Sequence, residues 1–368
     1  MKKRLIALAL LAIMSTTLLA CGNTGEEKEG ETKSSLKVGM VTDAGTIDDK
    51  SFNQGAWEGI LKAQDDLGIE SNYLRPSGTT EADYIKEITN LYDTGYKFIV
   101  APGFKFETAI YKVQEKYSDA KFVIIDGSPN NGKDGEERIN KVADNTVAIY
   151  FSEQEGGFLV GVAAALELKE GELGFIGGMK LPAVQKFNWG FQQGVKYANE
   201  NLGTNMNIKP ENVIYQGTFD KIEAGQQLAA TMYNNGVKAI FTAAGAVGVG
   251  AIKEAKDRAI KGQDAWIIGI DVDQYEDGIY NEAENKSVVL TSAIKKVYNT
   301  SYNIIKDELE GNFPGGETLI FDLKSGGLGI PDENPNLSKE TQDKVNEVLE
   351  QIKAGKIEIS DTKGNLID

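Results

Sequence analysis

The sequence predicts an α/β protein of two lobes, each with a parallel sheet covered by helices on both faces. Short apolar runs, most of them ending at Asp or Gly, alternate with segments of helical periodicity through most of the chain. Strands that are apolar throughout and alternate with helices are typical of parallel sheets buried on both faces. Roughly 330 residues follow the N-terminal segment. A chain of this length is usually too long to fold around a single small hydrophobic core, which favours two lobes.

Eight β-branched or apolar runs are the expected strands: 36–43, 97–103, 121–127, 172–178, 212–217, 238–245, 265–271 and 287–293. The apolar spacing predicts helices at 51–67, 81–92, 107–117, 187–201, 222–234 and 246–260, and an amphipathic helix at 339–354. A polar, glycine-containing loop before residues 144–152 indicates a domain break there. We expect one lobe from 36–145 plus about 275–320, and the other from 146–274 plus about 321–368, joined by a hinge.

The N-terminus has the composition of a secretory signal. Three basic residues precede an apolar stretch, and Leu18, Leu19 and Ala20 lead to Cys21, the one cysteine of the chain. We expect residues 1–20 to be a lipoprotein signal peptide and Cys21 to carry a lipid. Residues 21–35 hold almost no apolar side chains and are expected to be a flexible tether. An ordinary signal peptide or a short anchor is the alternative, although the apolar stretch is short for a span of roughly 20 residues.

Composition excludes several classes of function. The chain has 39 basic and 55 acidic side chains, a net charge of −16, so nucleic acid is a poor partner. It has no histidine, which excludes Ser-His-Asp and Cys-His catalysis and most zinc sites. No phosphate-binding P-loop is present. Residues 273–284 resemble a calcium loop only loosely, because Tyr275 stands where an oxygen ligand belongs. We therefore expect neither a cofactor nor a metal.

The candidate site lies where the strands end, because ligands of parallel sheets bind beyond the carboxyl ends of the strands. Six residues mark that rim: Asp43, Gly103, Asp126, Gly178, Gly245 and Asp271. The richest segment is 42–55, which follows the first strand and opens the first helix. Asp48 and Asp49 suit a helix start, where carboxylates cap free amides. Helix capping does not explain why Phe52 lies among these polar residues.

This segment and five further motifs resemble the basic membrane protein family. The motifs are the Leu-Leu-Ala-Cys ending, DxGxxxDxSFNxxxWxG from Asp43, IIDG, GGxxxPxVxxFxxGFxxG, GIDxDQ and LTSxxKxV, in the family's order over about residues 36–330. The resemblance implies the type I periplasmic binding protein fold. It also implies a lipid-anchored, extracytoplasmic substrate-binding subunit of an ABC transporter. The characterised branch of the family binds purine nucleosides of the adenosine, guanosine and inosine class.

Transferred to matching positions, the resemblance implies a role for each site residue. Phe52 and Phe187 would stack on the two faces of the base, and Asp43 and Asn53 would read its edge. Asp126 and Asp271 would accept hydrogen bonds from ribose hydroxyls, Lys295 would approach the sugar, and the Gly245 backbone would also contact it. Alternative readings make Asp126 and Asp271 simple strand ends, Phe187 a core residue, and Lys296 rather than Lys295 the inward lysine.

Taken together, these features predict a monomeric, non-enzymatic receptor at the cell membrane that delivers nucleosides to a permease and its ATPase. Three alternatives remain. One is a nucleoside-sensing signalling lipoprotein of the same fold, and another is a binder of sugars or other small polar ligands. The third is a nucleoside hydrolase that uses Asp43, Asp126 and Asp271.

Overall fold

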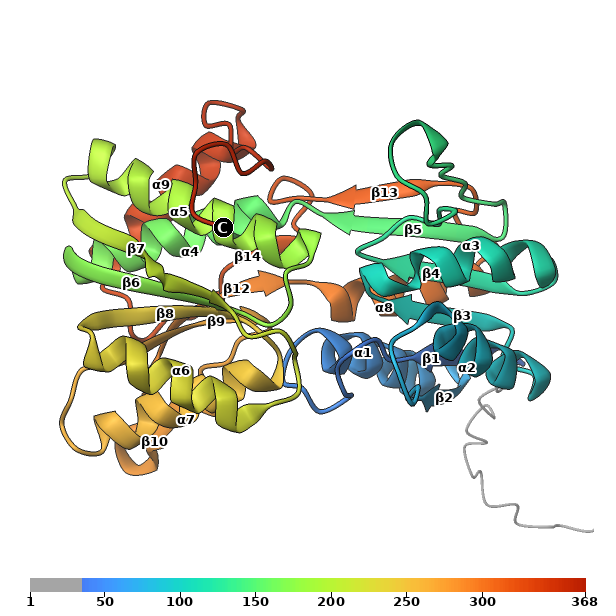
Figure 1. Ribbon diagram of the computed structural model, residues 1–368, viewed down its shortest axis with the longest axis horizontal. Helices are drawn as coiled ribbons and strands as arrows, with labels where there is room; N and C mark the ends of the chain where they lie inside the picture. Colours follow the sequence, from blue (N-terminus) through green and yellow to red (C-terminus); the bar gives the residue numbers. More distant parts are fainter. Residues whose placement is uncertain (1–34) are drawn as a thin grey trace, which may run out of the picture. The chain divides into compact units, whose positions relative to one another are not determined.

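Two six-stranded sheets form the framework of residues 35–368, the part that the structure, a computed structural model, describes (Figure 1). The expected signal peptide, Cys21 and the tether up to residue 34 lie outside the described residues. The first sheet contains β1 (Lys37–Val41), β2 (Glu70–Leu74), β3 (Phe98–Pro102), β4 (Lys121–Ile125), β5 (Thr146–Phe151) and β13 (Thr318–Phe321). Its strand order is β13-β5-β4-β3-β1-β2, and all neighbouring strands are parallel.

The second sheet contains β6 (Glu170–Gly177), β7 (Asn205–Tyr215), β8 (Val237–Ala243), β9 (Trp266–Asp271), β12 (Val289–Lys295) and β14 (Leu328–Gly329). Its order is β14-β12-β9-β8-β6-β7, and β14 alone runs antiparallel to its neighbour. A short antiparallel pair, β10 (Ile279–Asn281) and β11 (Lys286–Ser287), follows β9. The two parallel sheets confirm the expected α/β class.

Helices cover both faces of each sheet. The α-helices are α1 (Phe52–Leu67), α2 (Glu81–Asp93), α3 (Glu107–Lys116), α4 (Glu153–Leu168), α5 (Pro182–Asn201), α6 (Ile222–Asn234), α7 (Ala246–Ala259), α8 (Val297–Leu309) and α9 (Lys339–Lys353). On the first sheet α2 pairs with α3, and α1 with α8. On the second sheet α6 pairs with α7, and α4 with α5, while α9 packs on α4. The inner strands β1, β3, β4, β5, β8, β9 and β12 bury nearly all their side chains, as the continuous apolar runs predict, whereas the edge strands β2, β7 and β13 are partly exposed.

The chain passes between the two sheets three times. It leaves the first sheet between β5 and α4, returns between β12 and α8, and leaves again between β13 and β14 (Figure 1). The first passage falls in the expected break at 144–152. Sheet membership differs from the expected lobe ranges at two strands, because β5 belongs to the first sheet and β12 to the second. Motion of the two lobes about these three connections stays a prediction.

All eight expected strands and all seven expected helices are present, whereas several elements were missed for identifiable reasons. β2 is a half-exposed edge strand of mixed polarity, ESNYL, that gives no apolar run. α4 is buried over most of its length, so its sequence lacks the apolar period of a surface helix. None of the described helices, α4 included, has the length and apolar composition needed to cross a membrane. β13 and β14 are too short to give a sequence signal.

Close packing of α4 against α5 depends on glycines in both helices. A Cβ at Gly194 of α5 would lie 2.1 Å from the carbonyl oxygen of Phe158, and one at Gly161 of α4 would lie 2.5 Å from that of Phe191. Backbone atoms cannot move away as a flexible side chain could, so any larger residue forces the two helices apart. This packing fixes α5, the helix that carries Phe187, against the second sheet.

We expect Gly194→Ala to lower the free energy of unfolding by about 1–3 kcal/mol or more, because the added methyl overpacks the contact between α4 and α5. Urea denaturation of the purified protein measures this change. Gly329→Ala is the matched control: its added Cβ meets no atom within 4 Å, so a change below about 0.5 kcal/mol is expected. Equal effects of the two substitutions would contradict this account of the packing.

Candidate functional site

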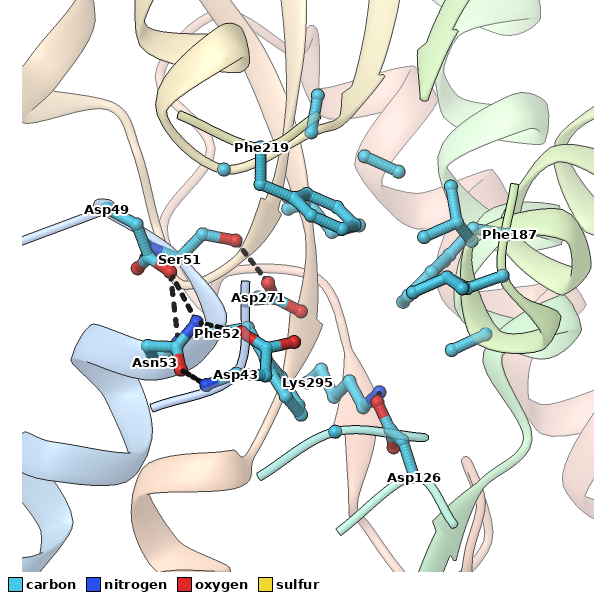
Figure 2. A pocket seen from close by; sticks show the side chains of 18 of the residues that line it. Asp43, Asp49, Ser51, Phe52, Asn53, Asp126, Phe187, Phe219, Asp271 and Lys295 are labelled. Carbon is cyan, nitrogen blue, oxygen red and sulfur yellow. Dashed lines mark hydrogen bonds and ion pairs between the residues drawn. The ribbon is translucent and has the colours of Figure 1, made fainter. Parts of the chain in front are cut away.

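A cavity lies where the carboxyl ends of strands from both sheets meet (Figure 2). It holds about 640 Å³ of space free of atoms, a volume that includes space open to solvent. Its lining combines carboxylates, aromatic rings, one lysine and small apolar side chains: Asp43, Asp49, Ser51, Phe52, Asn53, Gly103, Phe104, Asp126, Leu181, Ala183, Val184, Phe187, Phe219, Ala243, Ala244, Gly245, Ile270, Asp271 and Lys295.

All eight residues named from the sequence line this one cavity, although they are spread over some 250 positions of the chain. They come from the ends of β1, β4, β9 and β12 and from the starts of α1, α5 and α7: Asp43, Asp126, Asp271, Lys295, Phe52, Asn53, Phe187 and Gly245. Their assembly follows from the parallel topology, which gathers the carboxyl ends of strands at one edge. Their individual contacts with a ligand stay a prediction.

Asn53 holds the first carboxylate in place. Its Nδ2 donates to Asp43 Oδ1 at 2.9 Å and to Asp49 Oδ2 at 3.0 Å, and its Oδ1 accepts from the Asp43 amide at 3.3 Å. Both of its N–H groups are therefore committed within the protein. Asp43 Oδ1 also accepts from the Gly45 amide at 2.9 Å. Asn53 therefore holds Asp43 in place, and its own contact with a ligand stays a prediction.

Asp49 caps the start of α1, as the sequence indicates, but it also lines the cavity. Its two oxygens accept from the backbone amides of Ser51, Asn53 and Gln54, which have no partner inside the helix. Burial nevertheless raises the pKa of Asp49 to about 6, partly offset by these hydrogen bonds. Burial also raises the pKa of Asp43. The loop before α1 therefore presents a carboxyl-rich wall to the cavity.

Asp126 and Asp271 occupy equivalent places in the two sheets. Asp126 follows β4 of the first sheet, Asp271 ends β9 of the second, and both have left-handed backbones, with φ of 62° and 63°. Few residues other than glycine adopt this conformation, and Asp is among those that tolerate it. Such strain is often found at functional sites, where it aims a side chain. The shared conformation argues against the reading of these residues as ordinary strand ends.

One buried ammonium joins the two sheets at this point. Lys295 ends β12 of the second sheet, and its Nζ donates to Asp126 Oδ2 at 2.5 Å and to Glu153 Oε1 at 3.0 Å. Its side chain is 2% exposed, whereas the neighbouring Lys296 is exposed, so Lys295 is the inward lysine. The ammonium also lies 5.1 Å from the ring centre of Phe52 and 5.9 Å from that of Phe187.

The charges of this cluster do not balance. Burial alone would lower the pKa of Lys295, but the carboxylates of Asp126, Glu153 and Asp271 together raise it above its ordinary value. Burial, reinforced by Glu153 and Asp271 and opposed by Lys295, raises the pKa of Asp126. Burial also raises that of Asp271. The carboxyl groups of Asp126, Glu153 and Asp271 surround the Lys295 ammonium, and only Glu153 has a second cation nearby, with its Oε2 3.8 Å from Lys186 Nζ. Asp126 Oδ1 is buried with no hydrogen-bond partner. That oxygen is an acceptor left available at the cavity wall.

Sequence reasoning missed several residues of the cavity. Ser51 lies in the segment 42–55 but is not among the residues predicted for the site, yet its Oγ donates to Asp271 Oδ2 and so connects the two sheets (Figure 2). Phe219, between β7 and α6, and Phe104, just after β3, add two further aromatic rings to those of Phe52 and Phe187. A Cβ at Gly178 would lie 2.3 Å from Phe219 Cδ1, so glycine makes room for this ring. The position of Phe219 just after a predicted strand was the available signal.

Phe187 is both a core residue and a wall of the cavity. It is 3% exposed and its ring meets Phe241 edge-on, with ring centres 6.0 Å apart. Its buried packing fixes the ring in place rather than excluding a ligand contact. Trp57 and Trp189 are absent from the cavity lining, and Trp57 packs on Tyr73.

The chemistry of the cavity suits an uncharged ligand with a flat apolar part and several donor groups. Aromatic rings offer stacking surfaces, while the carboxylates offer acceptors for hydroxyl or N–H donors. Within residues 35–368, no group of three His, Cys, Asp or Glu side chains is arranged to hold a metal ion. The fold and the cavity together define a two-sheet binding protein for a small polar ligand.

Comparison with known proteins narrows this class. Residues 36–363 match the family model described as ABC transporter substrate-binding protein PnrA-like, and the chain belongs to this family. It is 36% identical to the CD4+ T-cell-stimulating antigen of Listeria innocua, over 98% of this chain and 99% of that protein. It is 32% identical to the ABC transporter nucleoside-binding protein BmpA of Lactococcus lactis, with the same two coverages.

The fold has close counterparts among solved structures. An ABC transporter solute-binding protein from Aeropyrum pernix K1 superposes with a TM-score of 0.75 at 26% identity, covering 89% of this chain and 94% of that one. The protein therefore has the type I periplasmic binding fold. As a member of the PnrA-like family, it is a substrate-binding component that works with the permease and ATPase of an ABC transporter.

We expect Lys295→Met to lower the free energy of unfolding by about 3–5 kcal/mol at pH 7.5, because it leaves several buried carboxylates without their cation. Carboxyl groups with a raised pKa bind protons more tightly in the folded state, so the variant's free energy of unfolding falls as pH rises. Part of the loss should therefore be recovered at pH 5. Urea denaturation of unligated protein at both pH values measures this, and Lys296→Met, at the exposed neighbour, should change little at either.

Proposed function

We propose that this protein captures purine nucleosides at the extracytoplasmic face of the cell membrane and presents them to an ABC transporter. The observation that carries the proposal is one cavity in which aromatic rings and carboxylates from both sheets face one another, with Asp126 Oδ1 left without a hydrogen-bond partner. The printed function of the Lactococcus relative, nucleoside binding, supports the same ligand class.

The base of the nucleoside is proposed to lie between Phe52 and Phe187. These rings come from the starts of α1 and α5, and both face the Lys295 ammonium. Stacking on an aromatic side chain contributes roughly 1–3 kcal/mol per base in nucleic-acid-binding proteins, and the same contact serves here. Phe219 adds apolar surface to the same pocket. Asp43, aimed by Asn53, accepts from an N–H on the edge of the base.

The ribose is proposed to lie near Asp126 and Asp271. Asp126 Oδ1 has no partner within the protein, and hydrogen bonds to a charged acceptor are the stronger kind. A hydroxyl donor satisfies that buried oxygen, which otherwise carries a desolvation cost. Gly245 precedes α7 as its N-cap residue and has a φ of 55°. Its backbone lies at the same cavity.

The excess of negative charge favours nucleosides over nucleotides. A 5′-phosphate would meet the carboxylates of Asp43, Asp126 and Asp271, with one buried lysine to offset them. That lysine is already paired with Asp126 and Glu153. The cavity therefore suits an uncharged ligand.

Ligand capture is proposed to occur by closure of two lobes about the three connecting segments. Contacts between the sheets support this: Ser51 Oγ donates to Asp271 Oδ2, Lys295 to Asp126, and Gln274 Nε2 to the Lys50 carbonyl oxygen at 2.9 Å. Closure around the ligand then offers the permease a surface that the open form lacks. We propose that the protein acts as a monomer and carries out no chemistry on its ligand.

We expect adenosine, inosine or guanosine to bind in isothermal titration calorimetry, and AMP, adenine and ribose to bind at least tenfold more weakly. Phe52→Ala should weaken nucleoside binding by about 1–3 kcal/mol, because one stacking face is lost. Tyr73→Ala, at a half-exposed ring outside the cavity, is the control.

AMP binding as tightly as adenosine contradicts the charge argument, while Phe52→Ala with full affinity favours a sugar ligand. Free hypoxanthine after incubation with inosine would instead indicate an enzyme.

Cys21 is proposed to carry the lipid that anchors the protein, on the strength of the Leu-Leu-Ala-Cys ending. Several acyl chains hold a protein to a bilayer stably, whereas one does so only marginally. Cys21→Ala should therefore release the protein from the membrane fraction and leave its nucleoside affinity unchanged. Fractionation followed by calorimetry checks both parts, and loss of binding would show that anchor and site are not separate.

A further inference from the structure

Glu153 does not line the cavity, yet it pairs with the lysine that does. It is the first residue of α4, directly after the first passage of the chain between the sheets, and it is 2% exposed. Its Oε1 accepts from Lys295 Nζ at 3.0 Å, and its Oε2 lies 3.8 Å from Lys186 Nζ of α5. A buried carboxylate in this place costs free energy unless a cation pairs with it.

The Lys295 ammonium is divided between two carboxylates. One N–H points to Asp126 Oδ2 and another to Glu153 Oε1, so Lys295 contacts Asp126 through a single oxygen. The other oxygen, Asp126 Oδ1, stays buried and unpartnered. Without Glu153, the three-donor ammonium could turn to both oxygens of Asp126, and the free acceptor would disappear.

We propose that Glu153 is a positioning residue that keeps Asp126 Oδ1 open for a ligand hydroxyl by drawing the Lys295 ammonium toward α4. The selectivity of the site for a hydroxylated sugar then depends on a residue the ligand never touches. The surrounding groups agree with this arrangement. The rings of Phe52, Phe151 and Phe187 enclose the ammonium, with centres 4.9–5.9 Å from Nζ, and leave it few other directions in which to donate.

A cycle of protein variants and ligand variants tests this inference, which rests on the proposed nucleoside function. Adenosine, inosine and guanosine are each titrated beside their 2′,3′-dideoxy analogues, which lack both ribose hydroxyls. We expect the unaltered protein to prefer the hydroxylated member by at least tenfold. Glu153→Gln, which keeps the shape but removes the charge, should reduce that preference to below about threefold, with little change for the dideoxy analogue.

Two further variants separate positioning from stability. Glu155 is a second carboxylate of α4, half-buried, which accepts from the Leu323 amide and does not contact Lys295. The Glu155→Gln variant should therefore keep the full preference for the hydroxylated ligand. Glu153→Asp keeps the charge but is one methylene shorter and no longer reaches the ammonium. If Glu153→Gln does not fold, Glu153→Asp supplies the same comparison and should lose the preference in the same way.

The outcomes distinguish the two proposals. If the unaltered protein binds none of the three nucleosides, the proposed function is wrong. If it binds them with the expected preference and folded Glu153→Gln and Glu153→Asp retain that preference, Glu153 does not position Lys295 and this inference is wrong. A variant that binds both members of each pair equally more weakly also contradicts it, since that result indicates a structural role alone.

Discussion

The ion pair between Lys295 and Asp126 is the interaction on which the rest of the site depends. It joins the end of a strand in one sheet to the end of a strand in the other, and both side chains are buried at the wall of the cavity. A buried pair of this kind is weak evidence for stability, because desolvation offsets much of the attraction. Its value here is geometric. It sets the spacing of the two sheet edges and aims one carboxylate at the space between them.

The charges around this ion pair support the proposed preference of the cavity for neutral ligands. Several carboxyl groups crowd around one cation, and burial raises the pKa of Asp43, Asp126 and Asp271. An arrangement with more acceptors than donors remains incomplete until a ligand supplies the missing donors. Neutral molecules rich in hydroxyl and N–H groups do so without adding charge. The left-handed backbone conformations of Asp126 and Asp271 keep their carboxylates directed at the cavity. The conformational strain is offset by the stability of the surrounding parallel sheets.

Much of this organisation could be predicted from the sequence, because it rests on strong local patterns. Apolar runs ending at Asp or Gly mark β1, β4 and β9, and the parallel topology then brings Asp43, Asp126 and Asp271 to one edge. The features that could not be predicted depend on contacts between residues that are far apart in the sequence. Glu153 opens a helix with no amphipathic period, and the role of Ser51 appears only when Asp271 lies beside it. Asn53 has the residue type of a ligand contact, but its side-chain N–H groups donate to Asp43 and Asp49.

The three passages of the chain between the two sheets also constrain the order in which the protein can fold. β13 pairs with β5 across 170 positions of the sequence, from Ala148 to Thr318, and β14 pairs with β12 at the edge of the other sheet. Contacts between segments so far apart in sequence carry a large loop-closure cost and form slowly. Neither sheet can be completed until residues beyond 318 are available, so a growing chain stays without its final topology through most of its synthesis. A polypeptide that finishes folding this late remains for a long time in a state that a translocation channel can thread.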